Sequence, residues 1–185
     1  MIDRRHFIGL LGLVGLSLTA CGNSGVSASD ESQVQAQVTE SQDSIAGESG
    51  DSGNDAKLFK EYLESDEVKG FTAAAGVVID ACDSYQNGDY DACLSKLDQS
   101  ALDAFDALKG KEDVPEVAEE VHGDFVNAAV AYYEAAMYIM TGSYLEDESK
   151  KRRAGNLALQ QISDANDYLN EAAAAMDRAR KKITG

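Results

Sequence analysis

An apolar repeat that alternates steps of three and four residues runs through residues 56–185 and constrains the fold more than any other feature. This spacing places apolar side chains along one stripe of an α-helix and is typical of helices that pack side by side. The clearest run consists of Ala158, Ile162, Ala165, Leu169, Ala172, Met176, Ala179 and Ile183. The 185 residues include a single proline, so almost nothing interrupts such helices. The repeat therefore predicts an all-α domain.

Similar repeats mark three more helices. The first comprises Phe71, Ala75, Val78, Cys82 and Tyr85, the second Tyr90, Leu94, Leu97, Ala101, Ala104 and Leu108, and the third Ala118, Val121, Phe125, Ala128, Tyr132, Ala135 and Ile139. A less regular piece from Leu58 to Leu63 precedes the first helix, and we expect Gly70 to bend or break that helix. With the C-terminal run, the pattern predicts an antiparallel up-down four-helix bundle.

Turn residues separate the expected helices. Asn87-Gly88-Asp89 offers a left-handed C-cap followed by an N-cap, and Thr141-Gly142-Ser143 is expected to end the third helix. The two hairpin tips also resemble each other: Tyr85-x-x-Gly88-Asp89-Tyr90 is echoed by Tyr138-x-x-x-Gly142-Ser143-Tyr144. Shared turn chemistry explains the echo more simply than duplication of a helical hairpin, which stays open.

Residues 1–20 read as a signal peptide, because Arg4 and Arg5 precede an apolar stretch that is too short to span a bilayer. The segment Leu18-Thr19-Ala20-Cys21 resembles the lipobox of bacterial membrane lipoproteins. That resemblance implies cleavage before Cys21 and a diacylglyceryl group with palmitate-like chains on its sulfur. The alternative is an ordinary secretory signal with a coincidental cysteine.

The first residues also resemble a second export signal. Asp3-Arg4-Arg5-His6-Phe7-Ile8-Gly9 is similar to a twin-arginine motif, which implies export of a folded protein. General secretion, with the two arginines serving only as n-region charge, remains the alternative. Either route places the protein at the cell membrane, lipid-anchored, on the extracytoplasmic face.

Residues 21–55 are expected to form the lipidated cysteine and a disordered tether. Residues 22–55 contain no Lys, Arg, Pro or aromatic residue, and Ser, Gly, Gln and scattered acids dominate. Such a segment buries too little apolar surface to offset the entropy lost on ordering. A helical domain spanning 56–185 would follow this tether. The length of the tether suits a Gram-positive-type envelope somewhat better than an outer membrane.

The formal net charge of −17 limits the possible partners. It argues against nucleic acid, which is bound through a basic face, and against electrostatic docking on anionic lipid. Residues 149–185 hold eight Lys and Arg against four acids, so the last helix is expected to attract the acidic remainder of the domain.

Cys82 and Cys93 lie at similar distances on either side of Gly88. An antiparallel hairpin would bring them roughly opposite each other, and a disulfide between them fits an exported protein. We expect this disulfide, with two buried free thiols as the alternative.

Few residues suggest chemistry. Glu119 and His122 form an E-x-x-H pair, but the domain has no second histidine to complete a di-iron site. We therefore expect no metal and no cofactor. Tyr132, Tyr133, Tyr138 and Tyr144 form the only aromatic concentration and are, with Glu119 and His122, the candidate contacts for a ligand or partner.

These patterns predict a non-catalytic helical module that acts in binding, as an adaptor or in envelope structure. Its expected partners are the membrane, through the lipid, and a protein of the envelope, and it could form a homo-oligomer. A ligand- or metal-carrying bundle is the alternative, and a hydrolase comes third. No Gly-rich phosphate loop and no nucleophile elbow occurs in the chain.

Overall fold

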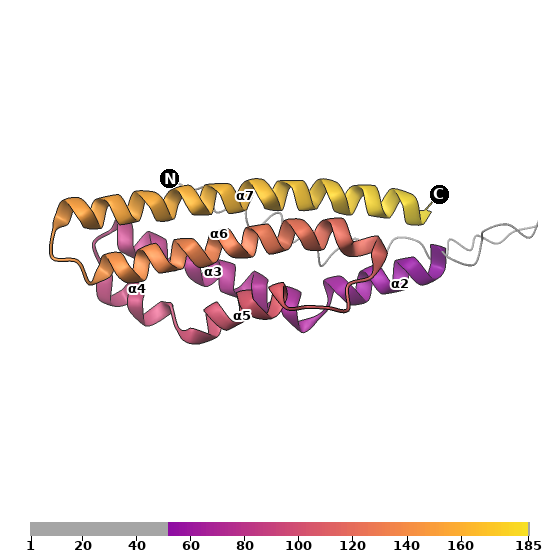
Figure 1. Ribbon diagram of the computed structural model, residues 1–185, viewed down its shortest axis with the longest axis horizontal. Helices are drawn as coiled ribbons and strands as arrows, with labels where there is room; N and C mark the ends of the chain where they lie inside the picture. Colours follow the sequence, from indigo (N-terminus) through magenta and orange to yellow (C-terminus); the bar gives the residue numbers. More distant parts are fainter. Residues whose placement is uncertain (1–51, 185) are drawn as a thin grey trace, which may run out of the picture.

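A computed structural model describes residues 52–184, which form six α-helices and a short 3-10 helix, with no strand among them (Figure 1). The elements are α2 (Ser52–Leu63), α3 (Asp66–Gln86), α4 (Tyr90–Lys96), α5 (Gln99–Lys109), η1 (Glu116–Ala118), α6 (Glu119–Ser143) and α7 (Glu148–Thr184). The all-α prediction is confirmed for these residues. The expected signal peptide, Cys21 and nearly all of the tether lie outside them, although α2 already begins at Ser52, ahead of the predicted boundary at residue 56.

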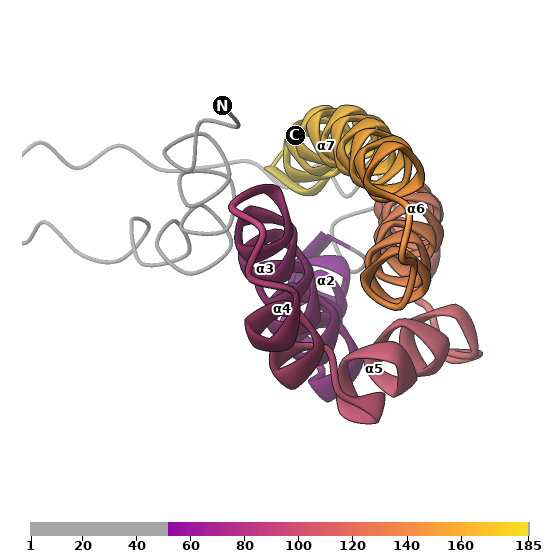
Figure 2. The ribbon, with the colours of Figure 1, turned by 90° about the vertical axis from the view of Figure 1, so that its left-hand side faces the viewer.

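Helices α6 and α7 form a long antiparallel hairpin that makes the most extensive contact in the described chain. Figure 2 shows this hairpin on one side of the molecule and α3 with α4 on the other, while α5 lies along the lower edge. Helix α5 packs against both α3 and α6. The core therefore lies between α3, α5 and the hairpin.

Aromatic rings fill the middle of this core. The Phe105 ring stacks on the Tyr132 ring with centroids 6.3 Å apart, and Phe71 lies 6.2 Å from Phe105 and 5.5 Å from Phe125. Many of the other core positions are alanine, which lets helix backbones approach closely. Among the described residues no charged side chain, and no polar one other than the tyrosines and cysteines of the core, is buried.

The sequence predicts a bend or break at Gly70, but the N-terminal helical region breaks elsewhere. Gly70 lies inside α3, where a Cβ would meet Ala104 Cβ at an ordinary 3.6 Å. The chain breaks instead before Ser65, whose side chain caps α3 by accepting from the Val68 N–H at 3.5 Å. A serine followed by two acids is a stronger start signal than a glycine is a stop signal.

The predicted second helix is also two helices. Helix α4 ends at Lys96, and Asp98 caps α5 by accepting the Ala101 N–H at 3.2 Å. Residues 52–184 therefore contain six α-helices where the apolar repeat predicted four. Leu97 and Ala101 are buried on either side of the interruption, which explains why the repeat continues across it.

The turn predictions fared better. Gly88 has a φ of 79°, in the left-handed region expected of it, and Asp89 caps α4 by accepting the Ala92 N–H at 3.1 Å. Helix α6 ends at Ser143, as predicted. None of the helices within residues 52–184 is long and apolar enough to cross a membrane.

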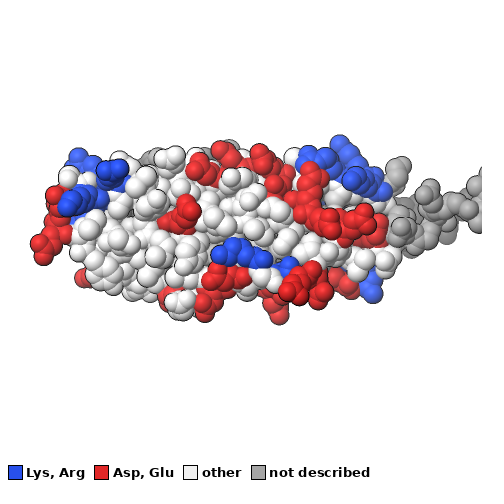
Figure 3. Space-filling view, in the orientation of Figure 1, with Lys and Arg blue, Asp and Glu red and all other residues white. Residues whose placement is uncertain are grey.

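Figure 3 shows lysine and arginine gathered near both ends of α7, with acids between them. The first group consists of Lys150, Lys151, Arg152 and Arg153, and the second of Arg178, Arg180, Lys181 and Lys182. The expected attraction between the last helix and the acidic remainder has one direct instance, the 2.5 Å pair between Arg178 of α7 and Glu120 of α6. Because both side chains are more than half exposed, water and salt weaken this pair.

Candidate functional site

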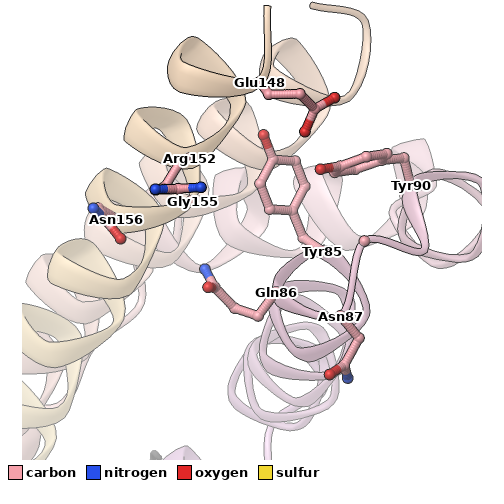
Figure 4. A pocket seen from close by; sticks show the side chains of 9 residues that line it. Tyr85, Gln86, Asn87, Tyr90, Glu148, Arg152, Gly155 and Asn156 are labelled. Atoms are coloured by element: carbon pink, nitrogen blue, oxygen red, sulfur yellow. The ribbon is translucent and has the colours of Figure 1, made fainter.

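A cleft of about 490 Å³ lies where α3 ends and α7 begins (Figure 4). We call it the Tyr85 cleft; its lining residues are Tyr85, Gln86, Asn87, Gly88, Tyr90, Glu148, Arg152, Gly155 and Asn156. Its volume lies in the range of small-molecule sites, although its lining side chains are more polar than is usual for them.

Tyr85 forms the inner wall of the cleft. It is buried, and its hydroxyl donates a hydrogen bond to the Lys151 carbonyl oxygen at 2.9 Å. Two glycines make room for its ring: a Cβ on Gly142 would collide with the Tyr85 hydroxyl, and a Cβ on Gly155 would lie 3.0 Å from Tyr85 Cε1. Burial raises the pKa of Tyr85 to about 12, so the hydroxyl stays protonated and remains a donor at neutral pH.

A second layer holds Tyr90 against Tyr85. The two rings meet edge to face with centroids 5.0 Å apart. Lys151 Nζ lies 4.4 Å from the centroid of the Tyr90 ring and donates to Glu148 Oε1 at 2.9 Å. The Glu148 carboxylate accordingly raises the pKa of Lys151. The charge of Glu148 is thus already matched by a neighbouring cation.

Exposed polar side chains form the rim. Gln86 extends from the end of α3 toward α7, which carries Arg152 and Asn156 (Figure 4). Within residues 52–184, no carboxylate lies within 4.0 Å of the Arg152 guanidinium. The cleft can therefore offer the planar cation of Arg152 and the amides of Gln86 and Asn156 to a ligand, whereas the Asn87 amide donates to the Asp83 carbonyl oxygen.

The predicted contact His122 lies elsewhere. Its Nδ1 is 3.1 Å from the Tyr62 hydroxyl, and the two rings meet edge to face with centroids 5.8 Å apart. Burial lowers the pKa of His122, and the nearby Lys111 lowers it further. Glu119 is exposed, and the described part of the chain contains no group of three or more His, Cys, Asp and Glu side chains placed to hold a metal.

The four predicted tyrosines do not form one surface. Tyr132 is in the core, and its hydroxyl donates to Asn166 Oδ1 at 3.3 Å. Tyr133 is half-buried below Lys109 Nζ, which lies 5.3 Å from the ring centroid, and Tyr138 packs against the edge of the core. Tyr144 is 76% exposed at the α6–α7 turn. Because His122 and Tyr144 are 22 residues apart along α6, they are separated by about 33 Å.

The structure does not contain the expected disulfide. Cys82 and Cys93 are buried free thiols, the arrangement that the sequence analysis kept as its alternative. Cys93 Sγ donates to the Tyr90 carbonyl oxygen at 3.0 Å and lies 3.1 Å from Ser143 Oγ. Burial raises the pKa of Cys82 to about 11 and also raises the pKa of Cys93, so both thiols are protonated at neutral pH. The hairpin places the cysteines in the same region, but Cys93 is satisfied by local polar partners.

The echo between the hairpin tips and the Asn87-Gly88-Asp89 turn signal both lie near the cleft. Both tips lie at the same end of the molecule, and the Tyr85–Lys151 and Cys93–Ser143 hydrogen bonds connect them. Gln86, Arg152 and Asn156 were not among the residues predicted from the sequence. The basic run at residues 150–153 together with the echo could have indicated them.

In comparisons with known proteins, no family model, no curated protein and no solved structure matches this chain.

Proposed function

We propose that this protein is a lipid-anchored lipoprotein of a bacterial cell envelope whose helical domain is a non-catalytic binding module. The lipobox-like segment that ends at Cys21 supports the anchor. The Tyr85 cleft supports binding. The proposal includes an up-down arrangement in which α2 with α3, α4 with α5, α6 and α7 act as the four columns of the expected bundle.

The observation that carries the proposal is the position of the cleft relative to the start of the helices. Helix α2 lies at the end of the molecule where α7 ends, whereas the cleft lies at the other end, where α7 begins (Figure 1). The 37 residues of α7 span about 55 Å. A chain anchored at Cys21 reaches the helices at Ser52, so the cleft would be presented away from the membrane.

The chemistry of the cleft favours binding over catalysis. Guanidinium, amide and protonated phenol groups recognise ligands through hydrogen bonds. Covalent hydrolysis through a serine or cysteine needs that nucleophile within hydrogen-bond reach of a base, and the nine residues described as lining the cleft include no serine, cysteine or histidine. The exposed rim also suits a partner that binds and leaves without a conformational change.

The anchor is tested by replacing the lipidated residue. In the native host, the wild-type protein should be found in the membrane fraction, with a diacylglyceryl mass on its N-terminal Cys21 peptide. Cys21→Ala should lose that mass and leave the membrane fraction. A wild-type protein without lipid would contradict the anchor while leaving the binding module untouched.

The binding role is tested by photo-crosslinking in intact cells. A photoreactive phenylalanine analogue at Asn156 should give a discrete crosslinked product, because Asn156 lines the cleft. The same analogue at Asn170, an exposed asparagine on α7 outside the cleft, is the matched control. Equal products from both positions, or none from Asn156, would contradict the proposal.

A further inference from the structure

We infer that the Tyr85 cleft recognises the free carboxylate end of a peptide. This inference rests on the proposed binding function and names its ligand class. A carboxylate, followed by one or two peptide groups, matches the cation and amides that α3 and α7 bring together.

Arg152 is the expected carboxylate ligand. Its guanidinium presents parallel N–H donors in a planar fork, which matches the two oxygens of a carboxylate. The side chain is exposed at the rim, and no described carboxylate is within ion-pair distance. Lys151, by contrast, is engaged by Glu148 and the Tyr90 ring. Arg152 is therefore the cation of the cleft that is available to a ligand.

The surroundings favour an anion in spite of the net charge of −17. Lys150 and Arg153 flank the Lys151–Arg152 pair in the sequence, and the basic group at this end of α7 is visible in Figure 3. The positive end of the α7 dipole and the negative end of the α3 dipole meet at the cleft, so the basic side chains set the sign of the local potential. Glu148 is the one acid among the lining residues, and its ion pair with Lys151 reduces its repulsion. The electrostatic potential at the cleft should thus attract a carboxylate, although the net negative charge of the whole molecule repels one.

The two amides extend the match from a carboxylate to a peptide. Gln86 and Asn156 each carry one carbonyl acceptor and an NH₂ donor, the same pair of groups that a peptide bond offers. The half-buried Tyr90 ring supplies an apolar contact for a small side chain. A volume of about 490 Å³ holds a few residues and excludes a folded domain.

The test uses the full chain in detergent micelles and two synthetic probes. One is acetyl-Ala-Ala-Ala with a free carboxylate, and the other is the same peptide with a C-terminal amide. Titration followed by ¹H–¹⁵N NMR should show saturable shifts of the Gly88 and Gly155 amides with the acid. The amide form should bind about tenfold more weakly, because it cannot form the paired bonds to Arg152.

Matched variants locate the effect. Arg152→Gln should weaken binding of the acid peptide about tenfold, and Asn156→Ala should weaken both peptides. Arg153→Gln removes the same charge from a neighbouring exposed residue that does not line the cleft, and it should change binding much less. Equal binding of the two peptides, or equal losses in the two arginine variants, would overturn the inference.

Other outcomes separate this inference from the proposed function. If neither peptide binds while crosslinking from Asn156 persists, the carboxylate ligand is wrong and the binding module stands. Native mass spectrometry of protein released from its own membranes distinguishes the two sources of such a carboxylate. A co-purifying mass of a few hundred daltons identifies a short free peptide, whereas a larger mass identifies the C-terminus of a partner protein.

Discussion

Tyr85 occupies space that two glycines leave open, and this packing holds α3, α6 and α7 together beside the cleft. Its hydroxyl and ring lie where a side chain on Gly142 or Gly155 would stand. Glycine usually weakens a helix, yet here it allows a buried tyrosine to reach the backbone of a third helix. The wall of the cleft therefore requires glycine rather than alanine at positions 142 and 155.

Gly142→Ala tests this packing. Alanine is the better helix former by about 1 kcal/mol, but the new methyl would collide with the Tyr85 hydroxyl and lie 2.7 Å from Ala154 Cβ. Overpacking of this kind costs about 1–3 kcal/mol, so the free energy of unfolding should fall. Chemical denaturation measures the change.

Gly123→Ala is the matched control on the same helix. Gly123 is exposed and a Cβ there meets nothing within 4 Å, so alanine should stabilise the protein by about 0.5–1 kcal/mol. In a Tyr85→Phe background, which lacks the clashing hydroxyl, Gly142→Ala should cost less. Equal stability of the two alanine variants would contradict the packing argument.

The Tyr62–His122 contact predicts a pH dependence. His122 Nδ1 can accept the Tyr62 hydroxyl only while the ring is neutral, and burial holds its pKa below the ordinary 6.5. Between these two values the unfolded chain binds more protons than the folded protein. This contribution to stability is thus complete above pH 6.5 and is lost as the pH falls through the lowered pKa. Lys111 faces the same site, and its Nζ lies 3.0 Å from Glu67 Oε2. A backbone hydrogen bond and the hydrogen bond from Lys111 hold the pKa of Glu67 below its ordinary value, so this carboxylate does not titrate in the window.

Unfolding of the wild type and of His122→Gln at about pH 7.5 and about pH 5.5 measures the effect. The wild type should lose more free energy of unfolding between the two values than the variant does. An identical loss in both proteins would exclude His122 as the titrating group.

At the scale of the elements, Asp98 interrupts a helix that the apolar repeat predicts to be continuous, and Ser65 marks the break that the sequence places at Gly70. Both are N-cap residues, and the apolar pattern around Asp98 is uninterrupted. The spacing of apolar residues shows only which face of a helix is buried. Two consecutive helices that bury the same face therefore keep the same spacing across the break between them. The helix type and the buried residues could therefore be predicted, whereas the number of helices depended on recognising two local side-chain hydrogen bonds.

Asp98→Ala tests the second interruption. It removes the carboxylate that accepts the Ser100 hydroxyl and the Ala101 N–H, the hydrogen bonds that contribute most to lowering the pKa of Asp98. The melting temperature should fall by a few degrees, and the Ala101 amide should exchange faster. Asp98→Asn keeps an acceptor and should change both much less; equal losses in the two variants would assign the effect to charge.

Over the whole molecule, the candidate site could be predicted only in part. Its residues come from two segments, 85–90 and 148–156, about sixty positions apart in the sequence. The echo between the hairpin tips indicates two similar turns. Whether the two segments lie side by side depends on how the α6–α7 hairpin packs against α3. The predicted tyrosines failed as a cluster for a related reason: Tyr132 and Tyr133 are adjacent in α6, and a helix directs adjacent side chains to different faces.

The uneven packing predicts uneven protection across the molecule. Helices α6 and α7 contact each other along most of their length, whereas α2 is joined to the remainder through a small surface. That surface includes buried Phe59, Tyr62 and Leu63 and the Tyr62–His122 hydrogen bond. Local opening requires the least free energy where few apolar contacts are lost.

Hydrogen exchange followed by mass spectrometry should accordingly show fast exchange in α2 and the slowest exchange in the buried middle of α6. Tyr62→Phe removes the hydroxyl that bonds to His122 and should speed exchange in α2 alone. Gly142→Ala acts at the opposite end and should speed exchange near Tyr85 and at the start of α7, with α2 unchanged. If both variants instead increased hydrogen exchange equally in every helix, the domain would open as one cooperative unit. The cleft end would then have no local opening of its own.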